Sequence, residues 1–276
     1  MTSLSKMTSL SKMTSPRSNS FAVVKTKGNE QSAFPFFKDI LMSNTQPIEK
    51  QIHSRTALDV HSVFYTIQGE GPFAGHPAVF VRLAGCNLQC PMCDTDYTSK
   101  RLTLTAFALF GICYRLARRS EWRVPKPLVV ITGGEPFRQN IREFVTHLLN
   151  EDFLVQIETN GTLYQNLPWS KDLTIVCSPK TGAINKDLLP HIDAFKYVLD
   201  AGSISVFDGL PVKALDHPNS GRVARPPVGF SGTIYLQPID DHGETFMTDH
   251  LTACIKSCMT HGYTLGFQLH KIINLP

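Results

Sequence analysis

The chain has 276 residues, of which 42% are apolar and 18% charged, a composition typical of a globular protein rather than a disordered one. It contains no run of 18 or more apolar residues, so no membrane span is expected. The net charge of +4 belongs to residues 1–41, which hold six basic and two acidic residues; the remaining 21 basic and 21 acidic residues balance. A neutral body lacks the basic surface used for nucleic acid, so we expect a small-molecule substrate.

The N-terminal region is repetitive, with MTSLSK at 1–6 and again at 7–12. Such Ser- and Thr-rich sequence has no core-forming pattern, so residues 1–55 are predicted to be a disordered extension and residues 56–276 the folded domain. The seven cysteines are odd in number, and three of them fall within eight residues. This clustering favours metal binding over a disulfide framework and indicates a reducing, cytoplasmic compartment.

The rest of the chain alternates strand-like and helix-like segments. Short apolar, β-branched runs predict strands at 79–83, 128–132, 154–158, 173–177, 194–199, 233–237 and 266–269. Helices are predicted at 104–118, 138–151 and 248–261, and a Pro- and Gly-rich loop at 208–232. This alternation predicts an α/β fold with about six parallel strands. Polar residues follow several strands, at the sheet edge where such folds bind ligands.

Cys86, Cys90 and Cys93 form a C-x3-C-x2-C pattern directly after a predicted strand. Iron–sulfur clusters are held by cysteine thiolates, normally four of them. Three thiolates on one loop would bind three irons of a [4Fe–4S] cluster and leave the fourth iron open, as S-adenosylmethionine (SAM) chemistry requires. A zinc site or a chance group of buried thiols is the alternative, although a second ligand pair of the zinc-site kind is lacking nearby.

A second motif, Gly133–Pro136, reads GGEP and follows the strand at 128–132. It resembles the GGEP motif of radical SAM proteins, whose backbone and glutamate contact the SAM amino group. Glycines at a strand end allow the backbone to approach a ligand closely. In this order after the cysteines, the motif indicates a radical SAM enzyme.

Further segments make the resemblance more specific. In matching order over residues 60–276, they are TIQGEGP at 66–72, FVRL at 80–83, CDT at 93–95, ITGGEP at 131–136, ETNGT at 158–162, SPK at 178–180, LQP at 236–238 and QLHK at 268–271. Together these segments closely resemble the 7-carboxy-7-deazaguanine synthase family.

The resemblance implies a lyase of queuosine and 7-deazapurine biosynthesis. Members of the family convert 6-carboxy-5,6,7,8-tetrahydropterin to 7-carboxy-7-deazaguanine with loss of ammonia, through a 5′-deoxyadenosyl radical generated from SAM and with the help of Mg²⁺. The implied fold is a truncated (β/α) barrel of the radical SAM type, usually in a homodimer. A flavodoxin- or ferredoxin-type reductant is implied as well.

The resemblance also assigns roles to single residues. The substrate contacts are Ile67, Gln68, Gly69, Arg82, Thr132 and Pro276. The SAM contacts are Met92, Cys93, Asp94, Gly134, Ser178, Pro179 and Lys180. The cluster ligands are Cys86, Cys90 and Cys93, and the Mg²⁺ ligand is Thr95. A guanidinium suits the substrate carboxylate because it can donate two parallel hydrogen bonds.

Some features leave other interpretations open. Met92 stands where members of the family commonly have Trp. Gln68, Glu70, Gln237 and His270 are further polar candidates, and His270 shares a face with Gln268 if the segment 266–269 continues as a strand. The alternatives are a glycyl-radical activating enzyme, which acts on a protein partner, and a non-enzymatic iron–sulfur or zinc protein.

Overall fold

The structure is a computed structural model, and it describes residues 44–53, 56–118, 125–215, 222–239 and 249–275. Most of the predicted extension 1–55 and the candidate Pro276 therefore lie outside the described residues. Residues 44–53 belong to that predicted extension, yet they hydrogen-bond to the folded body, so over this stretch the structure differs from the expectation. None of the described helices is both long and apolar enough to span a bilayer.

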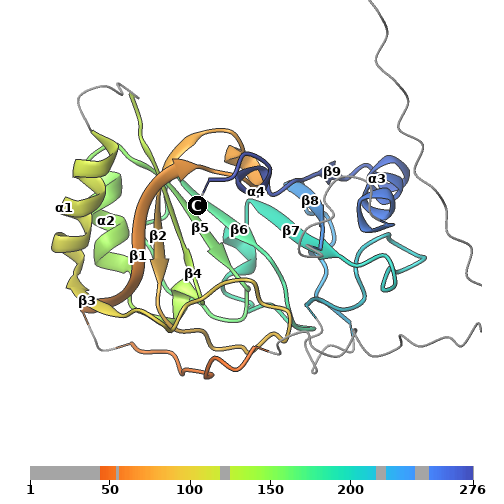
Figure 1. The fold of residues 1–276 in the computed structure, drawn as a ribbon, viewed down its shortest axis with the longest axis horizontal. Helices are drawn as coiled ribbons and strands as arrows, with labels where there is room; N and C mark the ends of the chain where they lie inside the picture. Colours follow the sequence, from red (N-terminus) through yellow and green to blue (C-terminus); the bar gives the residue numbers. More distant parts are fainter. Residues whose placement is uncertain (1–43, 54–55, 119–124, 216–221, 240–248, 276) are drawn as a thin grey trace, which may run out of the picture. The chain divides into compact units, whose positions relative to one another are not determined.

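One nine-stranded sheet organises the described residues (Figure 1). Its order is β3 (Leu102–Thr105), β1 (Ala57–Ile67), β2 (Pro77–Leu83), β4 (Leu128–Gly133), β5 (Leu154–Thr159), β6 (Leu173–Cys177), β7 (Ala194–Leu199), β8 (Thr233–Pro238) and β9 (Thr264–Leu265). Each neighbouring pair from β2 to β9 is parallel, whereas β1 pairs antiparallel with both β2 and β3. The fold is thus a mixed α/β fold with a large, mostly parallel sheet.

The helices follow the sequence pattern closely. They are α1 (Ala106–Ala117), α2 (Arg142–Asn150), α3 (Asp249–His261) and the short α4 (Leu269–Ile272), with 3-10 turns at Gly71–Phe73, Pro136–Arg138 and Leu189–His191. The Thr105 side chain starts α1 by accepting a hydrogen bond from the Ala108 N–H over 3.1 Å. Helices α1 and α2 pack against each other on one side of the sheet (Figure 1).

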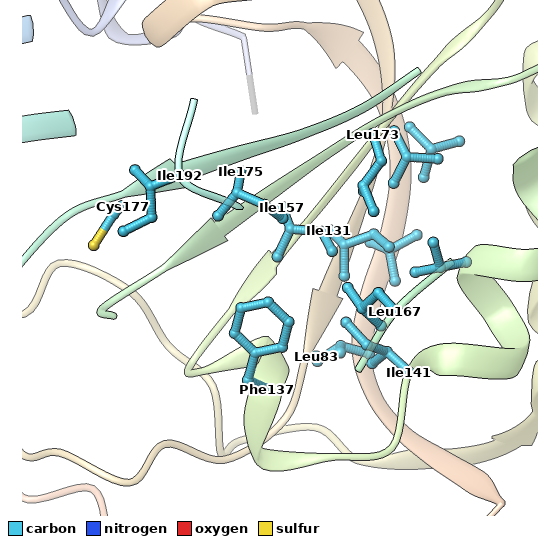
Figure 2. Packing of buried hydrophobic residues seen from close by; sticks show 14 of the residues in the cluster. Leu83, Ile131, Phe137, Ile141, Ile157, Leu167, Leu173, Ile175, Cys177 and Ile192 are labelled. Atoms are coloured by element: carbon cyan, nitrogen blue, oxygen red, sulfur yellow. The ribbon is translucent and has the colours of Figure 1, made fainter. Parts of the chain in front are cut away.

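Alternation along the strands separates an apolar face from a polar face. Leu83, Ile131, Ile157 and Ile175 come from four strands that are neighbours in the sheet, and they join the apolar core with Phe137 of the 3-10 turn Pro136–Arg138 (Figure 2). The neighbouring positions on these strands therefore point to the opposite face. That face carries polar residues in mid-sheet, although polar groups in a sheet centre normally need partners or a ligand.

Six of the seven predicted strands are confirmed as β2 and β4–β8, and the predicted helices as α1, α2 and α3. The strand predicted at 266–269 is wrong. Strand pairing ends with β9 and one further hydrogen bond, from the Gly266 N–H to the Leu236 carbonyl. Residues Leu269–Ile272 then form the helix α4. His270 is consequently helical and does not alternate with Gln268. Strands β1 and β3 were not foreseen.

Candidate active site

The three clustered cysteines lie on the loop 84–101, which joins the C-terminal end of β2 to β3. Cys86 and Cys90 are buried, Cys93 is half-buried, and all three are free thiols. The Cys93 N–H donates to the Cys90 carbonyl over 3.1 Å, and the Leu88 N–H donates to the Cys86 sulfur over 3.4 Å. These short-range bonds fold the loop back on itself between the first and the third cysteine.

Burial controls the protonation of these thiols. It raises the pKa of Cys86 to about 12, and the Glu135 carboxylate adds to that rise. It raises the pKa of Cys90 to about 11, although the Lys180 ammonium acts in the opposite direction. Thiols in such surroundings stay protonated at neutral pH unless a cation binds them, because a coordinating thiol is deprotonated outright. Ligation of a positively charged metal centre therefore suits these three side chains.

The donor set indicates the kind of metal centre that this loop suits. Among the described residues, no three His, Cys, Asp or Glu side chains converge closely enough for a single metal ion. The other cysteines pack in the apolar core: Cys113, Cys177, Cys254 and Cys258. In an iron–sulfur cluster each of three cysteines binds a different iron, so the three thiols of this loop suit a cluster with three protein ligands.

The glycine pair Gly133-Gly134 at the end of β4 packs directly against the cysteine loop. The Gly134 N–H donates to the Leu83 carbonyl over 3.2 Å, and the Glu135 N–H donates to the Gly85 carbonyl over 3.1 Å. A Cβ atom on Gly134 would lie 2.0 Å from the Gly85 oxygen, well inside contact distance. Only glycine allows this approach, so the GGEP motif fixes the position of the backbone that leads into Cys86.

Glu135 is completely buried beneath this contact. One carboxylate oxygen accepts from the Phe137 N–H and the Thr159 hydroxyl, and the other accepts from the Asn160 N–H, over 2.8 to 3.0 Å. Burial raises its pKa to about 7, although these hydrogen bonds act in the opposite direction. The resemblance gave this glutamate a contact with the SAM amino group, but here its carboxylate joins the ends of β4 and β5.

The polar face of the sheet lies between the cysteine loop and the turn after β1. Glu158 on β5 is its centre: it accepts from Gln68 Nε2 and Thr132 Oγ1 over 3.1 Å each and from Gln156 Nε2 over 3.0 Å. Arg82 is the register partner of Thr132 between β2 and β4. These side chains come from three strands and one turn, so the sheet register brings them together.

Arg82 has a buried nitrogen with no protein partner. Its Nε atom is shielded from solvent and makes no hydrogen bond in the structure. The guanidinium lies 5.8 Å from the ring centre of Phe64 on β1. An unpaired buried donor is costly, and a bound anion would remove that cost. Arg82 is therefore the group on this face that best suits a ligand carboxylate.

Lys196 on β7 joins two carboxylates across the polar face. Its ammonium contacts the Glu70 carboxylate, lies 3.9 Å from Glu158 Oε2, and is shielded with them from solvent. Burial alone would lower the pKa of Lys196, but Glu158 and Glu70 raise it above its ordinary value. Burial alone would raise the pKa of Glu70, but Lys196 lowers it. Lys196 and Glu70 are consequently both charged at neutral pH.

The C-terminal segment closes over the turn after β1. The Leu269 N–H donates to the Gly69 carbonyl over 3.1 Å, and Lys271 pairs with Asp94 of the cysteine loop at 3.0 Å. A Cβ atom on Gly69 would lie 2.2 Å from His270 Nδ1, so glycine is required for the imidazole to pack there. Burial lowers the pKa of His270, although the Glu70 carboxylate acts in the opposite direction. The neutral imidazole is therefore favoured at pH 7.

Lys180 follows the end of β6 and lies near the cysteine loop. Its ammonium donates to the Ser178 carbonyl over 2.9 Å and to the Ser178 hydroxyl. Burial lowers its pKa, whereas negative charge on Cys90 raises it. Pro179, between Ser178 and Lys180 in the chain, is buried. The Lys180 ammonium thus lies close enough to Cys90 for their charges to interact.

Comparison with known proteins places the chain in a family, although no protein-family model matches it. The 7-carboxy-7-deazaguanine synthase of Rhodospirillum rubrum is 44% identical over 227 residues, 79% of this chain and 93% of that protein. The enzyme of the same name from Rickettsia prowazekii is 37% identical over 227 residues, 80% of this chain and 89% of that protein. The chain belongs to the 7-carboxy-7-deazaguanine synthase family.

The fold agrees with that membership. The crystal structure of QueE from Escherichia coli superposes with a TM-score of 0.58 at 24% identity, covering 78% of this chain and 96% of that one. At this identity the match supports the fold alone. The 7-carboxy-7-deazaguanine synthase of Escherichia coli is 28% identical over 237 residues.

The residues that the family resemblance singled out fall into two groups. On the polar face and the turn beside it lie Ile67, Gln68, Gly69, Arg82 and Thr132. In or beside the cysteine loop lie Cys86, Cys90, Met92, Cys93, Asp94, Thr95, Gly134, Ser178, Pro179 and Lys180. The Lys271–Asp94 pair joins the cysteine loop to the C-terminal segment, whose Leu269 N–H donates to the Gly69 carbonyl. Pro276 lies outside the described residues.

Lys196 is the principal polar residue that the sequence analysis overlooked. It stands in AFKYVL, where a lysine interrupts an otherwise apolar strand. Lysine is almost never fully buried without a partner, so this position was a usable signal for a buried charge. Glu158 was noted only within ETNGT, and its role as the hub of three hydrogen bonds follows from the sheet register.

Proposed function

We propose that the chain is a radical SAM lyase that converts 6-carboxy-5,6,7,8-tetrahydropterin to 7-carboxy-7-deazaguanine with loss of ammonia. The observation that carries this proposal is the unpaired buried Nε of Arg82 on a polar face beside a loop with three free cysteines. An anionic substrate and a cluster are the two ligands that these features suit. The 44% identity to the Rhodospirillum rubrum enzyme supports the same activity.

In this proposal Cys86, Cys90 and Cys93 hold a [4Fe–4S] cluster, which supplies radical chemistry when SAM is bound. The SAM contacts are Met92, Cys93, Asp94, Gly134, Ser178, Pro179 and Lys180. The Lys180 ammonium lies close enough to Cys90 and Cys93 to oppose their negative charge. The close packing of Gly134 on Gly85 keeps this backbone next to the first ligand.

Arg82 is proposed to bind the substrate carboxylate through its guanidinium fork. Gln68 and Thr132 are held by the Glu158 carboxylate, and an amide can both donate to and accept from a pterin edge. Ile67, Gly69 and Pro276 complete the proposed substrate contacts. Lys196 keeps Glu70 ionised, so this carboxylate can accept hydrogen bonds from a bound ligand, and Glu158 lies 3.9 Å from the same ammonium.

The remaining expectations extend this proposal. Thr95 would bind Mg²⁺, which takes hard oxygen ligands and retains several waters. Its hydroxyl already donates to Asp94 over 3.3 Å, so this corner of the loop is rich in oxygen. We further propose a truncated barrel, a homodimer, a cytoplasmic location and a flavodoxin- or ferredoxin-type reductant. The product would enter queuosine or another 7-deazapurine pathway.

The decisive experiment is anaerobic reconstitution with iron and sulfide, followed by incubation with reductant, SAM, Mg²⁺ and the carboxy-tetrahydropterin. We expect 7-carboxy-7-deazaguanine by mass spectrometry and a cluster absorbance that disappears in Cys90→Ala. Production of 5′-deoxyadenosine without that product would instead favour a glycyl-radical activating enzyme. A chain that binds zinc, or that takes up a cluster without cleaving SAM, would be a non-enzymatic protein.

A further inference from the structure

The segment 44–53, here called the N-terminal strap, runs along the cysteine loop and donates hydrogen bonds to it. The Glu49 N–H donates to the Cys86 carbonyl over 2.7 Å. Asn44 Nδ2 donates to the Cys90 carbonyl over 3.1 Å, and the Asn44 N–H donates to the Pro91 carbonyl over 3.0 Å. The strap thus binds the backbone of two of the three proposed cluster ligands directly.

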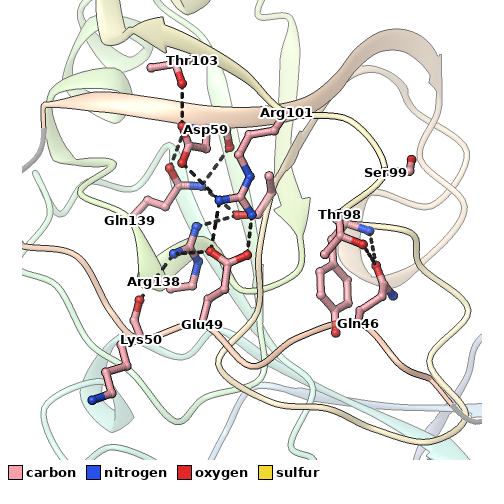
Figure 3. A network of polar contacts seen from close by, with 12 residues as sticks. Gln46, Glu49, Lys50, Asp59, Thr98, Ser99, Arg101, Thr103, Arg138 and Gln139 are labelled. Atoms are coloured by element: carbon pink, nitrogen blue, oxygen red, sulfur yellow. Dashed lines mark hydrogen bonds and ion pairs between the residues drawn. The ribbon is translucent and has the colours of Figure 1, made fainter.

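Gln46 makes the largest set of contacts from the strap to this loop. Its Oε1 accepts from the Tyr97 N–H over 2.8 Å and from the Thr98 hydroxyl over 3.0 Å. Its Nε2 donates to the Thr95 carbonyl over 2.9 Å, and its own carbonyl accepts from Gln89 Nε2 over 2.7 Å. One side chain therefore fixes the loop on the far side of Cys93, as Figure 3 shows in part.

Glu49 attaches the strap through charge. Its carboxylate pairs with Arg101 and, at 3.1 Å, with Arg138 (Figure 3). Arg138 is only 1% exposed and packs against Gly85, the residue before Cys86. The contact is so close that a Cβ atom on Gly85 would lie 2.7 Å from Arg138 Nε. A buried guanidinium without a counterion is strongly destabilising. Glu49 therefore compensates a charge that the fold places immediately beneath the cluster-binding loop.

The loop has few internal bonds with which to keep its shape. Between Cys86 and Tyr97 there is no helix or strand, and the backbone bonds that involve this stretch are mostly to other segments. Within it, the Cys93 N–H donates to the Cys90 carbonyl. Tyr97 is buried, and its hydroxyl accepts from Asn44 Nδ2 over 3.2 Å. The strap accordingly contributes bonds that the loop cannot make with itself.

We propose that the N-terminal strap positions the cysteine loop for cluster binding, and that Gln46 is a positioning residue that acts through Thr95 and Tyr97. This proposal rests on the proposed function, since it presupposes that the three cysteines hold a cluster. The proposal adds to the cluster site a segment that precedes β1 in the chain. The residues of this segment are not cluster ligands.

The test compares Gln46→Ala with Gln51→Ala in the full chain. Gln51 is a matched control from the same strap, because its amide donates to the Phe137 and Tyr164 carbonyls, outside the cysteine loop. Each protein is reconstituted anaerobically with iron and sulfide, and the visible cluster absorbance is followed after addition of an iron chelator. The EPR spectrum of the reduced cluster with SAM gives a second measurement that does not depend on turnover.

We expect Gln46→Ala to lose its cluster at least about fivefold faster than the wild type, because several hydrogen bonds to the loop are lost. Its EPR spectrum should change, while Gln51→Ala should match the wild type in both measurements. If Gln46→Ala does not fold, Gln46→Glu takes its place: it keeps the acceptor for Tyr97 and loses only the donor to Thr95. It too should lose its cluster faster than the wild type.

Two results would overturn the proposal, and they are distinguishable. Equal rates of cluster loss in the wild type, Gln46→Ala and Gln51→Ala would show that the strap does not position the loop, while the proposed function would stand. A folded wild-type chain that takes up no cluster would overturn the proposed function, and the role of the strap with it.

Discussion

Lys196 of β7 contacts Glu70 of the turn after β1, although 126 positions separate them in the chain. Both side chains are 10% exposed, and Glu158 lies 3.9 Å from the same ammonium. The pair joins the turn that follows an antiparallel strand to the middle of the parallel sheet. The stability of the polar face therefore depends on this one lysine.

Replacement of Lys196 with Met should strongly destabilise the protein, because it removes the cation beside the buried Glu70 carboxylate and the half-buried Glu158. We expect the free energy of unfolding to fall by about 3–5 kcal/mol, measured by urea denaturation of the cluster-free protein. Lys126→Met is the matched control: its pair with Asp172 at 2.8 Å lies at the surface and should contribute little. Equal losses in the two variants would contradict the importance of the buried pair.

The loss in free energy of unfolding that Lys196→Met causes should depend on pH, and the two pKa shifts give its direction. In the wild type the lowered pKa of Glu70 makes its contribution constant above the ordinary value of 4.5, and the raised pKa of Lys196 makes its contribution constant below 10.5. Neither contribution should change between about pH 6 and 9.

In Lys196→Met, burial instead raises the pKa of Glu70, so the folded state takes up a proton more readily than the unfolded state. The destabilisation should therefore shrink as the pH falls from 8 to 5. Urea denaturation of the wild type and of Lys196→Met at pH 8 and pH 5 measures the difference in their free energies of unfolding. A deficit that stays constant or grows on acidification would contradict this account.

A single methyl group at Gly134 should disrupt the cluster site. A Cβ atom there would lie 2.0 Å from the Gly85 oxygen, so Gly134→Ala must displace the backbone before Cys86. We expect iron incorporation to fall by more than half. Gly111→Ala is the control, since its Cβ atom on α1 meets nothing within 4 Å, and alanine favours a helix by about 0.5–1 kcal/mol. The Gly111→Ala variant should melt at a higher temperature than the wild type and incorporate the same amount of iron.

Arg82→Lys should weaken binding of the substrate carboxylate while leaving the cluster in place. An ammonium cannot reproduce the guanidinium fork, and loss of a charged hydrogen bond costs about tenfold or more in affinity. Calorimetry with the carboxy-tetrahydropterin measures this loss. The tetrahydropterin without the carboxylate is the comparison ligand and should bind the wild type and the variant alike. Equal weakening for both ligands would remove the carboxylate role from Arg82.

Local patterns were sufficient for much of the fold. The β-branched runs identified β2 and β4–β8, and their ends in Gly or Ser-Pro placed the polar residues at one edge of the sheet. Strand β1 was missed because its pattern is not a single apolar run. The strand expected at 266–269 was wrong because β9 is only two residues long. β3 and β9 are the two edge strands of the sheet, and such short strands depend on the neighbour they pair with, so their own sequence determines them poorly.

The sequence by itself determined the chemistry: the spacing of Cys86, Cys90 and Cys93, the GGEP turn and the family that these motifs share. Only the tertiary structure decided which distant side chains meet. Neither the pair of Glu70 with Lys196 nor the bonds from Gln46 to the cysteine loop follow from any local periodicity. The reason is physical: local patterns fix backbone conformation and burial, whereas contacts between remote residues depend on strand register and on the paths of loops.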